Sequence, residues 1–275
     1  MPTLPQPKTI DINGVDITYI EKGQGVPVVF VHGGLVDFRS WAFQIDPFAQ
    51  HYHVIAYSRR YHYPNSGADQ ASKYLATDNR DDLAELIRAL QLAPAHIVAS
   101  SYGAYISLLL ACTRPELVRS LALGEPPVPT LFGPEAVQSM GEQVEPARQA
   151  FQRGDPEQAI RGFQDRVAGP GGFDRFPAPA RQMMLDNAPE FNLEVNTSPD
   201  LYFSPFSCED ARTIRVPVLL VNGEESPQFL YQMTDMLEQC LSSAERAVIP
   251  HASHGMHNLN PQAYNETVLA FLDRH

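Results

Sequence analysis

The stretch "AHIVASSYGAYISLLLACT" (residues 95–113) places small and hydroxyl-bearing residues between two apolar segments. Residues 95–100 form a short apolar run, which is typical of a buried strand. Residues 102–113 favour a buried helix that ends at Arg114-Pro115. The sequence therefore predicts a strand, a sharp turn and a helix in direct succession.

The turn matches the nucleophile-elbow pattern G-x-S-x-G, with alanine in place of the first glycine, as Ala99-Ser100-Ser101-Tyr102-Gly103. Such a turn requires small residues two positions before and after the serine. Centring the pattern on Ser100 would place Val98 and Tyr102 there, and both are too large. Ser101 is therefore the candidate nucleophile, and the alternative is that the serine only caps a helix.

Strand-like and helix-like segments alternate on both sides of this turn. Short apolar runs and period-two patterns indicate strands, and an i, i+3, i+4, i+7 spacing indicates an amphipathic helix. The expected strands cover residues 14–23, 26–34, 52–58, 95–100, 119–127, 216–224 and 245–250, and the expected helices cover 76–92, 102–113, 227–241 and 260–275. This alternation predicts an α/β fold with a mostly parallel sheet and helices on both faces.

The alternation lapses between residues 128 and 212, where amphipathic pieces replace buried strands. A loop of this length without structure is implausible in a compact domain. We therefore expect a helical lid over residues 128–212, inserted at the carboxyl ends of the strands, where such folds bind ligands. Residues 1–127 and 213–275 are then the core domain.

Composition excludes several classes of partner. The 275 residues include 20 basic and 32 acidic side chains, a net charge of −12, which disfavours nucleic acid and anionic membranes. No apolar stretch approaches the roughly 20 residues of a membrane-spanning helix, and the first residues do not resemble a secretion signal. Three cysteines without a CxxC pair predict a reduced, cytoplasmic protein.

A nucleophilic serine needs a base and an orienting acid. The segment "VIPHASHGMHNLNP" (248–261) offers three histidines, but no acidic or cysteine ligands cluster beside them, so we expect no metal. Here the sequence resembles the α/β-hydrolase superfamily, which carries P-x-x-x-H before its last helix, as Pro250 to His254 does. The resemblance implies an eight-stranded, mostly parallel sheet and makes His254 the base.

The resemblance also implies an oxyanion hole. "VFVHGG" (29–34) is similar to the family's His-Gly turn, which assigns the backbone N–H groups of Gly34 and Tyr102 to this role.

In "YSRRYHYPNSG" (57–67), the family's usual Asp-x-Arg-Gly-x-Gly pattern is altered, so its aromatic residues either face the pocket or pack elsewhere. Arg59 and Arg60 either bind a substrate carboxylate or form structural ion pairs.

The acid of the triad has several candidates in the sequence. In the family this acid most often lies in the loop after the strand expected at residues 216–224, where this chain has Ser226, which cannot serve. Glu224 or Glu225 near the same loop are alternatives. We favour Glu125 at the end of the strand expected at residues 119–127, an arrangement that resembles zearalenone-lactone hydrolases.

These residues predict a serine hydrolase that cleaves a carboxylic ester or lactone through an acyl-enzyme, without a cofactor. The alternatives are a carbon–carbon bond hydrolase, a cofactor-free lyase, oxygenase or cyclase, and a ligand-binding receptor on the same fold. We expect a small apolar ester or lactone as substrate and a monomer or homodimer. The predicted pocket residues are Leu35, Tyr61, His62, Met183, Phe203 and Phe229.

Overall fold

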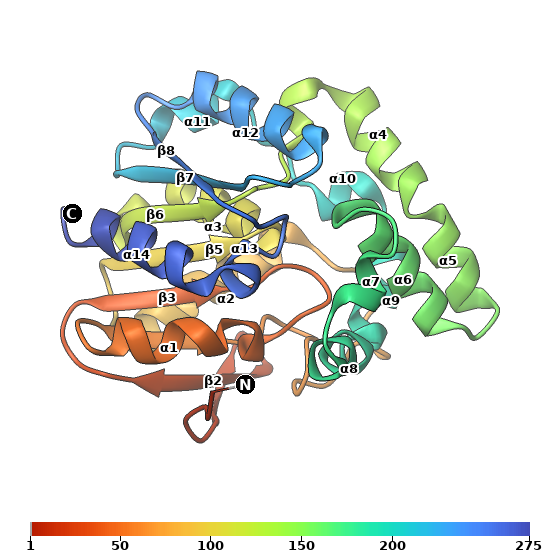
Figure 1. Ribbon diagram of the computed structural model, residues 1–275, viewed down its shortest axis with the longest axis horizontal. Coiled ribbons are helices and arrows are strands. Elements are labelled where there is room, and N and C mark those ends of the chain that lie inside the picture. The colour runs from red at the N-terminus through yellow and green to blue at the C-terminus, as the bar shows by residue number, and fades with distance from the viewer. Residues whose placement is uncertain (1) are drawn as a thin grey trace.

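A computed structural model describes residues 2–275 and places their strands in one eight-stranded sheet (Figure 1), of order β1-β2-β4-β3-β5-β6-β7-β8. The strands are β1 (Lys8–Ile12), β2 (Val15–Lys22), β3 (Pro27–Val31), β4 (His53–Tyr57), β5 (Ala95–Ser100), β6 (Val118–Gly124), β7 (Val218–Gly223) and β8 (Glu245–Ile249). β2 is antiparallel to both β1 and β4, and the remaining pairs are parallel. The predicted mostly parallel sheet is confirmed. β1 was not expected, because most of its side chains are exposed at the sheet edge and leave no buried pattern.

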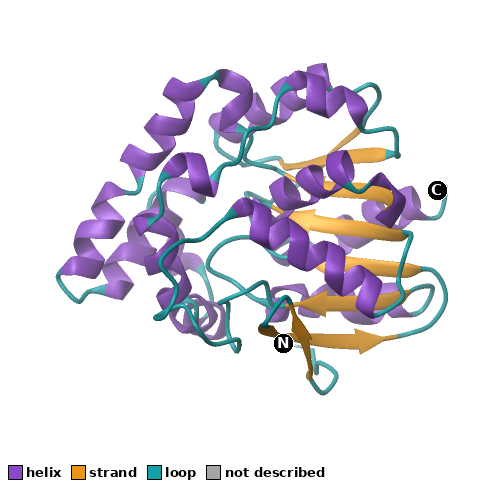
Figure 2. Ribbon diagram, turned by 180° about the vertical axis from the view of Figure 1, so that it is seen from behind, coloured by secondary structure: helices purple, strands orange, loops and turns teal. Residues whose placement is uncertain are grey.

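Helices cover both faces of the sheet (Figures 1 and 2). The strand pleat divides the core between them: Ile97 and Ala99 of β5 pack in one cluster, and Val98 packs in the other. One cluster includes α2 (Ala76–Ala89), α3 (Tyr102–Thr113) and α12 (Gln228–Cys240), and the other includes α1 (Ala42–Ala49) and α14 (Pro261–Leu272). The sheet is therefore buried between two helical layers.

The helices α4 to α10 follow β6 and lie beyond one end of the sheet (Figures 1 and 2). They are α4 (Pro134–Gln143), α5 (Glu145–Gln152), α6 (Pro156–Val167), α7 (Gly172–Arg175), α8 (Ala178–Asp186), α9 (Ala188–Asn196) and α10 (Pro199–Tyr202). The next helix before β7, α11 (Cys208–Thr213), packs instead on α12 and α3. Helices α5 to α9 form a small apolar core that includes Ile160, Phe173 and Phe191, and Leu35 from the loop after β3 packs into it. Short elements complete the chain: η1 (Phe38–Trp41), η2 (Pro115–Leu117), η3 (Pro129–Phe132) and α13 (Met256–Leu259).

The cysteines differ from the expectation of a fully reduced chain. Cys208 of α11 and Cys240 of α12 form a disulfide, and Cys112 is a free thiol. The prediction was wrong for this pair because residues 32 positions apart in sequence meet where α11 packs on α12. Among residues 2–275, no helix combines the length and apolarity that crossing a bilayer requires.

Candidate active site

Ser101 occupies the sharp turn between β5 and α3. Its backbone lies at φ 51° and ψ −125°, a conformation that non-glycine residues rarely adopt. Gly103 makes the turn possible, because a Cβ at this position would stand 2.4 Å from the His32 carbonyl oxygen and 2.5 Å from that of Val31. The strained turn therefore depends on close contact between the start of α3 and the end of β3.

His254 and Glu125 meet across the carboxyl ends of the sheet. His254 Nδ1 lies 2.6 Å from Glu125 Oε2, and the Glu125 side chain is completely buried. The second carboxylate oxygen accepts hydrogen bonds from Gly223 N at 3.0 Å and from Asn222 Nδ2 at 3.2 Å. Glu125 thus has fixed partners on both oxygens.

These partners determine the charge of the carboxyl group. Burial raises the pKa of Glu125, but the hydrogen bond and charge of His254 and the Gly223 N–H outweigh burial, so its pKa lies below the usual value. An ionised carboxylate can only accept, so the His254 Nδ1 donates to it, and in the neutral imidazole this leaves the lone pair on Nε2. Ser101 and His254 line the same cavities. Within residues 2–275 they form no hydrogen bond, a contact that often tightens only in the substrate complex.

The alternative acids lie away from His254. Glu224 and Glu225 are both exposed. Glu224 Oε2 accepts a hydrogen bond from His251 N at 2.9 Å, and the Glu225 backbone N–H donates to the Ala252 oxygen at 2.8 Å. The loop after β7 therefore directs these carboxylates outward, and the structure brings only Glu125 to the histidine among the three candidates.

Gly34 and Tyr102, the expected oxyanion-hole residues, line a cavity with Ser101. Tyr102 is the first residue of α3, and the first N–H groups of a helix have no acceptor within it. The Tyr102 ring is held in place because it stacks on Tyr202 at 4.1 Å between ring centroids, and its hydroxyl donates to the Tyr202 carbonyl at 2.7 Å.

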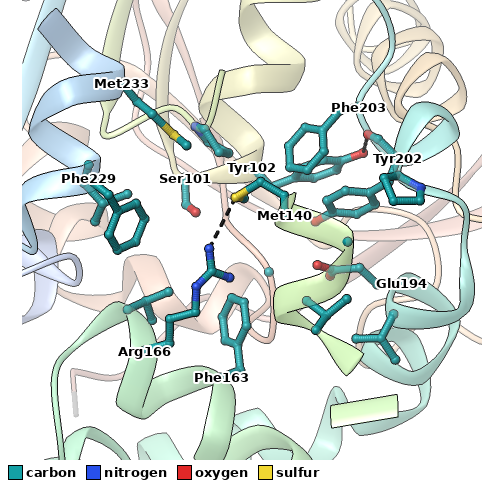
Figure 3. Close-up of a pocket in the computed structure, with 18 of the residues that line it drawn as sticks. Ser101, Tyr102, Met140, Phe163, Arg166, Glu194, Tyr202, Phe203, Phe229 and Met233 are labelled. Atoms are coloured by element: carbon teal, nitrogen blue, oxygen red, sulfur yellow. Dashed lines mark hydrogen bonds between the residues drawn. The ribbon is translucent and has the colours of Figure 1, made fainter. Parts of the chain in front are cut away.

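Two cavities meet at Ser101 and His254. The Tyr202 cavity (Figure 3) is lined also by Tyr202, Phe203, Phe229 and Arg166, and the Met183 cavity by Met183, Phe176 and His257. Three predicted pocket residues, Met183, Phe203 and Phe229, therefore do line the site.

The other three predicted pocket residues lie outside both cavities. Leu35 is fully buried in the apolar core shared with the helices between β6 and β7. Tyr61 packs near Tyr74 and Gly67. Leu35 and Tyr61 have positive φ angles, 61° and 67°, a backbone conformation that is uncommon for residues other than glycine. His62 is fully buried, with Nε2 3.1 Å from Glu190 Oε1.

Arg59 and Arg60 are structural. The buried Arg59 donates to the carbonyl oxygens of His32 at 3.0 Å and Gly33 at 2.9 Å. Arg60 Nε pairs with Asp82 at 2.6 Å. Both guanidinium groups are therefore occupied within the protein.

Sequence reasoning missed two charged residues of the Tyr202 cavity, Arg166 of α6 and Glu194 of α9 (Figure 3). Glu194 Oε2 lies 3.5 Å from the point where a Cβ on Gly34 would stand, which places its carboxyl beside the candidate oxyanion hole. Burial raises the pKa of Glu194 and of its neighbour Glu190. The i, i+4 spacing of the two glutamates puts them on one helix face, and this spacing was the feature of the sequence that could have identified them as a pair.

The fold and this arrangement of serine, histidine and acid define an α/β hydrolase. The chain belongs to the alpha/beta hydrolase family, whose model matches residues 28–267.

Two curated relatives match nearly the full length of the chain. The chain is 25% identical to an (E)-2-((N-methylformamido)methylene)succinate hydrolase of Acinetobacter baylyi, over 97% of this chain and 98% of the relative. It is also 25% identical to a 2-(acetamidomethylene)succinate hydrolase of Mesorhizobium japonicum, over 97% and 95%. Among solved structures, a thermophilic esterase from Thermogutta terrifontis superposes with a TM-score of 0.79 at 20% identity, covering 98% of each chain. That structure supports the fold alone.

Proposed function

We propose that this protein hydrolyses a carboxylic ester or lactone through an acyl-enzyme on Ser101. The observation that carries the proposal is the 2.6 Å contact between His254 Nδ1 and the buried Glu125 carboxylate, beside a serine in a strained turn. A nucleophile, a base and an acid that orients the base are the three parts that serine hydrolysis requires.

In the first half of the reaction, His254 Nε2 takes the proton of Ser101 as Oγ attacks the substrate carbonyl carbon. The carbonyl oxygen becomes an oxyanion, which the N–H groups of Gly34 and Tyr102 stabilise, each contributing about 3 kcal/mol as in a model case. Glu125 stabilises the imidazolium. His254 then gives its proton to the leaving alkoxide, and the carbon–oxygen bond breaks.

In the second half, a water molecule attacks the acyl-enzyme while His254 takes its proton. The tetrahedral intermediate collapses, the proton returns to Ser101 Oγ, and the carboxylic acid product leaves. We propose that residues 128–212 act as a lid in both halves. Support comes from Phe163 and Met183 of this segment, which line the cavities beside Ser101.

The test is turnover of p-nitrophenyl acetate and butyrate by the wild type, Ser101→Ala, Glu125→Gln and Glu224→Gln. We expect Ser101→Ala to be inactive and Glu125→Gln to lose about 10⁴-fold in kcat, because an amide favours the wrong tautomer of the histidine. Glu224→Gln is the matched control, since Glu224 is an exposed acid of the neighbouring loop.

Circular dichroism checks that each variant is folded. Full activity of a folded Ser101→Ala would overturn the acyl-enzyme and favour the non-nucleophilic alternatives. If Glu224→Gln instead of Glu125→Gln abolished turnover, the assignment of the acid would be wrong.

A further inference from the structure

Arg166 is a cation in the candidate active site that has no carboxylate partner. It lies in the last turn of α6 and lines the Tyr202 cavity with Ser101 and His254. Figure 3 shows its guanidinium between Phe163 and Phe229, directed toward Ser101 and Met140. Its contacts are with Met140 Sδ at 3.3 Å and the Phe229 ring at 5.4 Å, and it forms no ion pair within residues 2–275.

Two arginines that serve as comparisons, one of them on the same helix, do pair with carboxylates. Arg161, on the same helix, pairs with Glu157 at 3.0 Å and with Asp174 at 2.5 Å. Arg60 pairs with Asp82 in the core. A partly buried guanidinium with a thioether and an aromatic ring as neighbours lacks the acceptors that offset desolvation. Accordingly, burial lowers the pKa of Arg166. Binding an anion would restore the missing partner.

Glu194, the acid in the same cavity, does not fill this role. Its carboxyl lies on the side of Gly34, and among residues 2–275 it makes no ion pair with Arg166. Burial and the nearby Glu190 raise the pKa of Glu194, which favours its neutral form. The cavity therefore retains an unmatched positive charge near the candidate nucleophile.

We infer that Arg166 binds a carboxylate of the substrate, so that the substrate class is esters or lactones that carry a free carboxylate. The inference rests on the proposed function and refines the expectation of a purely apolar substrate. A guanidinium presents parallel N–H groups that match the two oxygens of a carboxylate. Met140, Phe163 and Phe229 supply an apolar surrounding in which this pair is less screened than in water.

A binding measurement tests Arg166 independently of turnover. Adipate and its uncharged analogue adipamide are titrated calorimetrically into Ser101→Ala, and into the same variant with Arg166→Gln, Arg166→Lys or Arg161→Gln. We expect adipate, but not adipamide, to bind Ser101→Ala. Succinate and glutarate are titrated as well, to test whether the site takes a shorter dicarboxylate. Arg166→Gln should weaken adipate binding at least tenfold, and Arg166→Lys by less, because lysine retains the charge but not the planar fork.

Arg161→Gln is the matched control, because it removes a cation of the same helix that lines neither cavity. It should leave adipate binding unchanged. Equal binding by the Arg166→Gln and Arg161→Gln forms would overturn the inference, as would the absence of binding by all three dicarboxylates. A purely structural role of Arg166 at the end of α6 would alter the thermal unfolding temperature without altering the preference for adipate over adipamide.

A kinetic measurement then connects the site to catalysis. The ratio of kcat/KM for mono-4-nitrophenyl adipate to that for 4-nitrophenyl hexanoate should fall at least tenfold in Arg166→Gln, mainly through KM for the adipate ester. The ratio should not change in Arg161→Gln. If neither ester is hydrolysed, the proposed function fails and the titration still decides the role of Arg166. If both are hydrolysed and Arg166→Gln leaves the ratio unchanged, the proposed function stands and the inference fails.

Discussion

Glu125 of the turn after β6 accepts a hydrogen bond from the backbone N–H of Gly223, the last residue of β7, at 3.0 Å. The same carboxyl group contacts His254 Nδ1 through its other oxygen. The acid is thus fixed by the neighbouring strand, and its side-chain length sets the position of the imidazole.

This relationship predicts that Glu125→Asp impairs catalysis although it keeps the charge. Removing one methylene withdraws the carboxylate so that it cannot contact both Gly223 and His254. We expect kcat for p-nitrophenyl butyrate to fall about 10²-fold, the size of effect that a misplacement of about 1 Å causes. Thermal unfolding serves as the control for folding. A folded Glu125→Asp with wild-type kcat would mean that the histidine does not depend on this contact.

Gly103 gives a second prediction, which concerns the turn that presents Ser101. An added Cβ would lie 2.4 Å and 2.5 Å from two carbonyl oxygens of the β3 end, and backbone cannot move aside easily. Gly103→Ala should therefore lower the free energy of unfolding by about 3 kcal/mol, as overpacking does. Gly162→Ala in α6 is the matched control, since nothing lies within 4 Å of its added Cβ.

Because alanine favours helix over glycine, the control should gain up to about 1 kcal/mol. Urea unfolding of both variants measures the difference. Equal stability of Gly103→Ala and the wild type would contradict the close approach of α3 to β3.

The candidate triad could be predicted because each of its members follows a strand that the sequence pattern indicates. Ser101 stands in an elbow motif, His254 in a family motif, and Glu125 directly after a buried strand. The carboxyl ends of parallel strands meet at one edge of the sheet, so their order along the chain is enough to bring such residues together.

The pocket could not be predicted in the same way. Leu35 and Tyr61 lie outside both cavities and have positive φ angles, a backbone conformation that the residue types leucine and tyrosine do not predict. Arg166 and Glu194 lie on amphipathic helices, where charged residues usually form the solvated face. Whether such a residue faces water or a cavity depends on how the helices between β6 and β7 pack on the sheet, which the local sequence does not encode.

Glu194 gives a prediction about pH. Burial raises its folded-state pKa above the ordinary value of 4.5, so above that pH the folded chain retains a proton that the unfolded chain has released. Folding then takes up protons, and this group makes the free energy of unfolding fall as the pH rises toward the raised value. Glu194→Gln cannot titrate and should remove this decline.

The relevant measurement is the difference in urea unfolding free energy between Glu194→Gln and the wild type from pH 6 to pH 8.5. The unfolding free energy of Glu194→Gln minus that of the wild type should increase by about 2 kcal/mol between these two pH values. Exposed Glu266→Gln is the control and should show no such trend. A pH-independent difference for Glu194→Gln would mean that the carboxyl is ionised in the folded protein.

The disulfide between Cys208 and Cys240 gives the last prediction, because it connects the final helix before β7 to the helix after it. Closing a loop with a separation of 32 residues restricts the unfolded chain and stabilises the fold by about 3 to 4 kcal/mol in the chain-entropy model. Cys240→Ser should lose this stabilisation in urea unfolding without reductant, whereas Cys112→Ser changes a free thiol and should not.

Dithiothreitol should lower the free energy of unfolding of the wild type to that of Cys240→Ser. An insensitive wild type, as stable with dithiothreitol as without it, would mean that the bond contributes nothing to the fold.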